Sequence, residues 1–139
     1  MRTRVVIYPH MRMDKSEVVE NLSAGRLRQF FKGMADETRL RILSLLSRRG
    51  ELCVCDLMRV LEMPQSTVSR HMAYLKNSGW VADRREGIWV HYSLAEPSDC
   101  VHEALLKCVR ECFGRFARFE GDERKLESLV EEGECCRQA

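Results

Sequence analysis

The sequence predicts a mainly α-helical fold with one small β-hairpin, arranged as a winged helix-turn-helix. Three observations predict it. Two short helical segments with apolar stripes meet at a tight turn around Pro64. The segment after them alternates apolar and polar residues on either side of Glu86-Gly87, which is typical of a β-hairpin. Other helical segments come before and after, so the expected order is helix, helix, helix, turn, helix, hairpin, helix.

The helices before the turn are indicated by apolar spacing and by capping residues. Residues 24–34 repeat apolar side chains at helical intervals. Asp36 is placed to cap a second helix, which Gly50 ends. A third helix is expected to begin near Val54, directly after a short extended stretch.

The second half of the predicted unit contains the hairpin and a long final helix. The helix after the turn is expected to stop at Gly79, and the hairpin follows it. Apolar residues then recur along one side of a helix from about Asp99 to Phe119. A break at Gly121 is expected before a short acidic helix.

The chain divides into three expected segments. Residues 1–22 form an N-terminal arm, residues 23–119 form the winged helix-turn-helix domain with dimerising terminal helices, and residues 120–139 form an acidic tail with a cysteine pair. Residues 1–94 carry 16 Lys/Arg against 10 Asp/Glu, whereas residues 95–139 carry 7 against 11. A basic body with an acidic tail favours a nucleic-acid surface on the first part.

Composition also argues against several classes of protein. No run of 18 or more apolar residues is present, so no transmembrane helix is expected. The N-terminus does not resemble a secretory signal peptide, so a cytoplasmic location is expected, with the seven cysteines mostly reduced. We find no nucleophile–base constellation and no phosphate-binding loop, and therefore expect no enzyme.

The helix after the turn carries small hydroxyl, amide and basic side chains on its outward side. Such residues allow close approach to a DNA groove and contact base edges or phosphates. Two arginines near the hairpin tip are placed to hold phosphate or the minor groove. The predicted DNA-binding residues are Gln65, Ser66, Thr67, Ser69, Arg70, His71, Arg84 and Arg85.

Four stretches in order resemble ArsR/SmtB-type metalloregulatory repressors, most closely the arsenic-responsive branch. They are "FFKGMADETRLRILSLL", "ELCVCDL", "STVSRHMAYLKNSGWV" and "REGIWVHYSL". The resemblance covers about residues 26–95. It implies a homodimer of winged helix-turn-helix subunits that binds double-stranded operator DNA and releases it when a metalloid binds.

Cys53 and Cys55 are the expected metalloid ligands. Residues two apart on a regular helix point about 200° from one another, so both thiols cannot clasp one ion within a helix. If the helix begins near Val54, Cys53 lies in the strand before it and Cys55 in its first turn. An ion that bound both would distort the start of the helix-turn-helix. Thiolates select soft ions, and As(III) or Sb(III) suits a cramped all-sulfur site.

A third sulfur ligand is missing from this motif. The arsenic-responsive pattern often reads "CVCDLC", but Met58 stands at the last position here. Either two thiolates suffice together with an exogenous ligand, or another cysteine contributes, with the tail favoured over the long helix. The further candidate ligands are Cys100, Cys108, Cys112, Cys135 and Cys136.

Three other interpretations remain open at the level of sequence. A sensor of a divalent soft metal such as Cd(II), Pb(II) or Zn(II) could use the same fold. A thiol redox sensor could oxidise either close cysteine pair. A zinc site on the final helix, built from Asp99, His102 and Glu111 or Cys112, is not favoured because a second histidine is missing.

Overall fold

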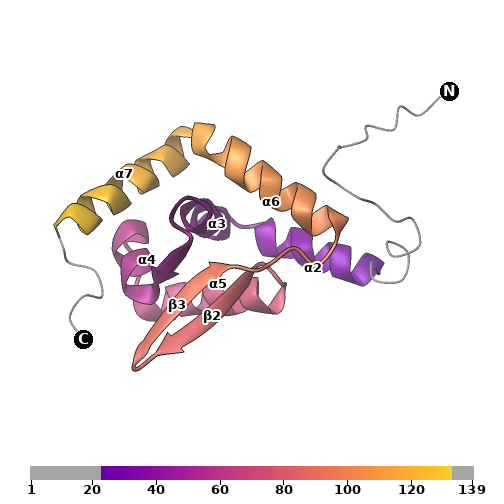
Figure 1. Cartoon of the computed structure of the whole chain (residues 1–139), viewed down its shortest axis with the longest axis horizontal. Helices are drawn as coiled ribbons and strands as arrows, with labels where there is room; N and C mark the ends of the chain where they lie inside the picture. The colour runs from indigo at the N-terminus through magenta and orange to yellow at the C-terminus, as the bar shows by residue number, and fades with distance from the viewer. Residues whose placement is uncertain (1–22, 133–139) are drawn as a thin grey trace.

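The computed structural model describes residues 23–132 and has seven helical segments and one three-stranded sheet. Figure 1 shows their arrangement. The predicted arm, residues 1–22, and the predicted tail ligands Cys135 and Cys136 lie outside the described residues. In chain order the elements are α2 (Ala24–Met34), α3 (Glu37–Arg49), β1 (Glu51–Cys53), α4 (Val54–Leu61), α5 (Gln65–Asn77), β2 (Val81–Glu86), β3 (Trp89–Leu94), α6 (Cys100–Cys112), the 3-10 turn η1 (Phe113–Arg115) and α7 (Ala117–Glu131).

The winged helix-turn-helix prediction is confirmed. Helices α4 and α5 are joined by a short turn in which Glu62 takes the left-handed conformation, with φ 54°. The β2–β3 hairpin follows α5 and turns at Gly87, whose φ of 61° suits a residue without a Cβ. The sheet also contains β1, the extended stretch expected before α4, whose pairing partner the sequence pattern did not predict. Strand β1 pairs antiparallel with β3, so the order is β1-β3-β2.

Helix α3 lies at the centre of the domain. In Figure 1 it runs between α6 and α7 on one side and the hairpin on the other. The side chain of Asp36 accepts the backbone N–H of Arg39 at 3.1 Å and so caps α3 as expected. Fully buried apolar side chains from α3, α4, α5, α6 and α7 form one core, which includes Leu43, Leu57, Met72, Leu106 and Leu126.

The single long helix predicted from Asp99 to Phe119 is wrong. Asp99 does cap α6, but this helix ends at Cys112 and the chain turns through η1. A Cβ at Gly114 would meet only the guanidinium end of Arg48, a partly exposed side chain that can move aside. The expected break at Gly121 is also wrong, because this residue lies inside α7.

Helix α7 folds back onto the domain instead of continuing away from it. It packs on α3 and α4, and its Asp122 and Leu126 are buried. The domain boundary expected between residues 119 and 120 therefore falls inside a helix that contributes to the core. Within residues 23–132, no helix is both long and apolar enough to cross a membrane.

Candidate functional site

Cys53 and Cys55 lie on either side of the junction between β1 and α4. Cys53 is the last residue of β1, opposite His91 of β3, and it is also the N-cap residue of α4. Its residue surface is 2% exposed, whereas Cys55 in the first helical turn is half-buried. The predicted start of this helix near Val54 is confirmed. The two cysteines therefore belong to different elements. An ion bound by both would disturb the junction between these elements.

A buried carboxylate lies beside this junction. Asp56 Oδ2 accepts the backbone N–H of Cys53 at 3.4 Å and lies 3.2 Å from Cys53 Sγ. Among the described residues, Asp56 Oδ1 has no hydrogen-bond partner. Burial raises the pKa of Asp56, which opposes full ionisation of the carboxyl group.

Cys55 lines a cavity of about 280 Å³ between α4, α5 and the hairpin. Met58, one helical turn after Cys55, lines the same cavity, so the residue that replaces the third cysteine of the pattern faces the same space. The remaining lining residues are Val54, Gln65, Ser69, Ile88, Trp89, Val90 and Tyr92. Sequence reasoning missed the contribution of β3, because only the folded sheet brings it to α4.

The candidate ligands on α6 lie away from this junction. Helix α6 packs on α3, on the side opposite the hairpin in Figure 1. Cys108 and Cys112 are exposed there, and partial burial together with the neighbouring Cys112 raises the pKa of the Cys108 thiol. Cys100, at the start of the same helix, is half-buried. Among the described residues, the cysteines of α6 therefore form no metal-ligating group with Cys53 and Cys55.

The zinc site that the sequence did not favour on α6 is not assembled among the described residues. His102 is 1% exposed and packs against the rings of Phe30 and Trp80, with ring centroids 4.9 and 5.1 Å away. Burial lowers the pKa of this imidazole. Asp99 caps the helix by accepting the backbone N–H of His102 at 2.8 Å. These residues have structural roles, and residues 23–132 contain no group of three or more metal-ligating side chains.

Helix α5 presents most of the predicted DNA-binding residues outward. Gln65, Ser66 and Arg70 are exposed, and Thr67 and Ser69 are partly exposed. The opposite side of the helix packs in the core through Val68, Met72 and Leu75. His71 differs from the other predicted residues because its Nδ1 lies 3.8 Å from Asp36 Oδ1, at the start of α3.

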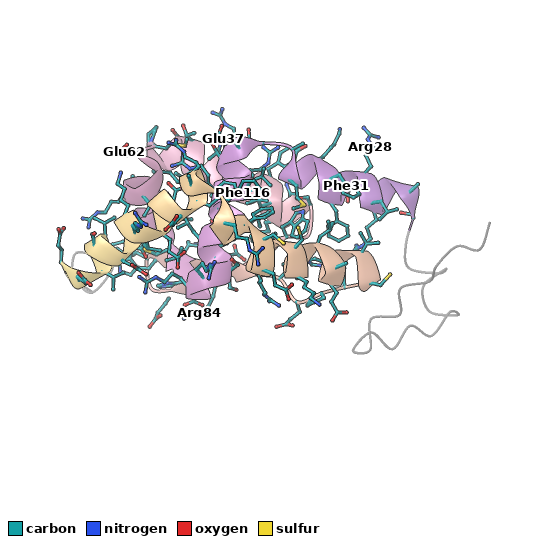
Figure 2. All side chains as sticks on the ribbon, turned by 90° about the horizontal axis from the view of Figure 1, so that it is seen from above. Arg28, Phe31, Glu37, Glu62, Arg84 and Phe116 are labelled. Atoms are coloured by element: carbon teal, nitrogen blue, oxygen red, sulfur yellow. The ribbon has the colours of Figure 1, made fainter. Side chains whose placement is uncertain are left out.

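The two hairpin arginines have different surroundings. Arg84, which is labelled in Figure 2, contacts Glu51 of β1 at 2.6 Å and Glu86 at 3.0 Å, and both carboxylates raise the pKa of its guanidinium group. Arg85 is exposed, and residues 23–132 hold no ion pair for it. Strand alternation places Arg85 on the same face as Asp83, which contacts Lys76 of α5 at 2.8 Å. Arg85 therefore faces the side of the sheet on which α5 lies.

We predict that Arg85→Ala weakens DNA binding more than Arg84→Ala. A free guanidinium displaces counterions from DNA, whereas Arg84 is already neutralised by two carboxylates. Arg85→Ala should lower the slope of log affinity against log salt by about 1. Fluorescence anisotropy on one operator fragment at several salt concentrations measures this slope, and equal slopes for the two variants would contradict the prediction.

Comparisons with known proteins agree with this geometry. Residues 36–83, which run from the cap of α3 into β2, match the family model "Bacterial regulatory protein, arsR family". The chain is 57% identical over 67 residues to the arsenical resistance operon repressor of Escherichia coli, a match that covers 48% of this chain and 57% of that protein. Across three arsenic-resistance relatives, the chain spans 57% to 66% of their lengths.

Solved structures show the same fold. The structure of HlyU from Vibrio cholerae aligns with a TM-score of 0.57 and 30% identity, covering 74% of this chain and 100% of that chain. The structure of AntR, titled an antimony-specific transcriptional repressor, aligns with a TM-score of 0.53 and 26% identity, covering 93% of this chain and 96% of that chain. The expectation of a regulatory protein, not an enzyme, is confirmed by these matches. The chain belongs to the ArsR family of bacterial regulatory proteins.

Proposed function

We propose that this protein is a transcriptional repressor that releases double-stranded operator DNA when As(III) or Sb(III) binds Cys53 and Cys55. The observation that carries the proposal is the position of the two thiols across the junction between β1 and α4. The names of relatives support the effector class, since one is an arsenical resistance operon repressor and another an antimony-specific repressor.

The release mechanism follows from the geometry of the junction. Cys53 is buried beside β3, and Cys55 faces the cavity from the first turn of α4. Bringing both sulfurs onto one ion requires the first turn of α4 to move or unwind. Helix α4 packs directly against α5, so this motion changes the tilt of the DNA-reading helix relative to the hairpin. If the ion binds the form with a displaced first turn of α4 more tightly than the DNA-binding form, its binding shifts the protein away from the DNA-binding form.

A homodimer is part of the proposal. Half-sites about one or two helical turns apart would be read by one α5 helix from each subunit. Apolar side chains remain exposed on the single chain, including Phe31 of α2 and Phe116 between η1 and α7 (both labelled in Figure 2), with exposures of 54% and 59%. Burial of such surface favours association. Sedimentation velocity of the operator complex checks the stoichiometry of two chains per site.

The test of the proposed function is a titration of the operator complex with several effectors. As(III) and Sb(III) should release the DNA from the reduced protein, whereas Cd(II), Zn(II) and peroxide should release little. Preferential release by Cd(II) or Zn(II) would instead support the divalent-metal interpretation, and release by peroxide alone would support the redox interpretation.

Removal of residues 134–139 tests the tail as the source of a third sulfur, since it should weaken the As(III) response without changing operator affinity.

A further inference from the structure

A groove lined by hydrogen-bond donors lies between α2 and the C-terminal end of α5. Its volume is about 270 Å³, and its lining residues are Gln29, Lys32, Tyr74, Asn77 and Ser78. All of them except the serine are exposed. The lining therefore offers an ammonium group, side-chain amides and a phenol hydroxyl, and it includes no carboxylate. Such a set of groups suits an anion with several acceptor oxygens.

Close packing of the two helices forms the floor of the groove. A Cβ on Gly33 of α2 would lie 2.5 Å from Ser78 Oγ and 2.8 Å from Trp80 Cδ1, so only glycine allows this approach. The indole Nε1 of Trp80 donates to the carbonyl oxygen of Phe30 at 2.9 Å. Ser78 Oγ donates to the carbonyl oxygen of Tyr74 at 2.8 Å. The end of α2 is therefore held in one position beside the end of α5.

Arg39 of α3 supports the wall that Tyr74 forms. Its guanidinium carbon lies 4.2 Å from the centroid of the Tyr74 ring. Nε of Arg39 donates to the carbonyl oxygen of Gly33 at 2.7 Å, and Nη2 donates to that of Lys32 at 3.0 Å. These carbonyls belong to the last turn of α2, whose partial negative charge repels anions. The guanidinium group offsets this charge and leaves the Tyr74 residue 41% exposed.

The groove continues the surface with which α5 is expected to meet DNA. Tyr74 follows Arg70 by four residues and Asn77 follows Tyr74 by three, so the three side chains share one face of the helix. Helix α5 has 13 residues and is therefore about 20 Å long, whereas the major groove is about 12 Å wide. When the N-terminal residues of α5 contact base edges, its second half reaches the phosphates at the edge of the groove.

The groove and the hairpin lie on opposite sides of α5. Lys76 is two residues from Tyr74, so it points about 200° away around the helix. Its Nζ contacts Asp83 of the hairpin at 2.8 Å. The hairpin is expected to hold DNA on that side of α5. A phosphate bound in the groove would hold it on the other side and so fix the helix in its register.

We propose that the groove between α2 and α5 binds a backbone phosphate of the operator, with Lys32 and Tyr74 as its principal ligands. This inference rests on the proposed function, because it requires that the protein binds DNA. Lys32 supplies the charge, and the hydroxyl of Tyr74 donates to a phosphate oxygen. The amides of Gln29 and Asn77 are placed to donate to the remaining oxygens. The contact positions the protein and carries no sequence information.

The experiment measures DNA affinity against salt concentration for two single variants. The full-length reduced protein first selects a duplex from a pool of random-sequence DNA, and an unselected mixed-sequence duplex of the same length serves for comparison. Lys32→Gln should lower the slope of log affinity against log salt by about 0.9 per bound subunit on both duplexes. Tyr74→Phe keeps the ring beside Arg39 but removes the hydroxyl. It should weaken both duplexes by about tenfold without changing the slope.

A matched control removes a positive charge elsewhere. Arg124 is exposed on α7 and pairs with Glu120, and α7 lies across α3 from α5 in Figure 1. Arg124→Gln should therefore keep the parental slope. A slope for Lys32→Gln equal to that of this control would overturn the inference. Losses confined to the selected duplex would also overturn it, because they would indicate base reading. A parent protein that prefers no sequence would contradict the proposed function, while the mixed-sequence duplex would still test the groove.

A second measurement locates the phosphate. Single phosphates of the selected duplex are replaced in turn by neutral methylphosphonates, and the affinity of each duplex is measured for the parent and for Lys32→Gln. At the contacted phosphate the parent should lose affinity, whereas the variant should lose little more, so the two changes are not additive there. This position should lie at the edge of a half-site. Additive effects at every phosphate would overturn the inference even if Lys32→Gln weakened binding.

Discussion

Cys53→Ser and Cys55→Ser are each expected to bind operator DNA and to lose its release by As(III). Loss of one thiolate removes the intramolecular second bond of the chelate. The As(III) concentration for half-release should therefore rise by about 100-fold or more. Electrophoretic mobility shift or anisotropy titrations on one operator fragment measure this concentration.

The structure explains why these variants keep their fold. Cys53 is the N-cap residue of α4, and serine is among the preferred residues at that position. Cys55 is half-buried at the edge of a cavity, where a hydroxyl can reach solvent. Cys108→Ser and Cys112→Ser are matched controls on α6 and should respond like the parent. A parental response from both single variants at Cys53 and Cys55 would place the effector site elsewhere in the chain.

The parts of the fold that were predicted correctly depend on local sequence signals. The side chain of Asp36 accepts a backbone N–H group three residues later and caps α3 as expected. Asp99 was expected only as the approximate start of a helix, and its side chain caps α6 in the same way. The Glu86-Gly87 turn and the start of α4 near Val54 also follow from nearby residues. The predicted placement of Cys53 before α4 and of Cys55 in its first turn was correct because it depends on where this helix begins.

The parts that were missed depend on contacts between distant residues. An extended stretch before α4 was expected, but its pairing with β3, some 40 residues later, was missed, because a pattern of three residues does not indicate a pairing partner. The same pairing brings Arg84 to Glu51, which distinguishes Arg84 from Arg85 although both are arginines in one strand. The cavity beside Cys55 likewise requires α4, α5 and β3 to be in place.

The fold-back of α7 was missed for a related reason. An apolar stripe continued from α6 to Phe119, which favoured one helix, but Phe116 is exposed and the chain turns at η1. A buried ion pair between α3 and α7 stabilises the turned arrangement. Arg41 of α3 donates from Nε and Nη2 to the two carboxylate oxygens of Asp122, at 2.7 and 2.8 Å. A search for apolar periodicity cannot detect this contact, because both partners are charged residues.

Asp122→Ala is expected to destabilise the domain by about 3–5 kcal/mol, because it leaves the Arg41 guanidinium buried without a partner. The side chains of the pair are 7% and 8% exposed, so water cannot replace the carboxylate. Hydrogen bonds and charge from Asp122 raise the pKa of Arg41, so the guanidinium stays charged and cannot escape the cost by losing its proton. Urea unfolding followed by circular dichroism measures the change in the free energy of unfolding.

A second ion pair in the same helix provides the control. Arg124 and Glu120 pair at i,i+4 on the surface of α7, so Glu120→Ala should cost less than about 1 kcal/mol. Replacement of both buried partners, Arg41→Met with Asp122→Leu, should recover most of the stability lost by Asp122→Ala, since no buried charge remains. Equal small losses from Asp122→Ala and Glu120→Ala would show that α7 is not an integral part of the domain. A large loss at Asp122 alone would instead place α7 in the domain, where Lys125 also contacts Glu62 at 2.9 Å and supports the turn between α4 and α5.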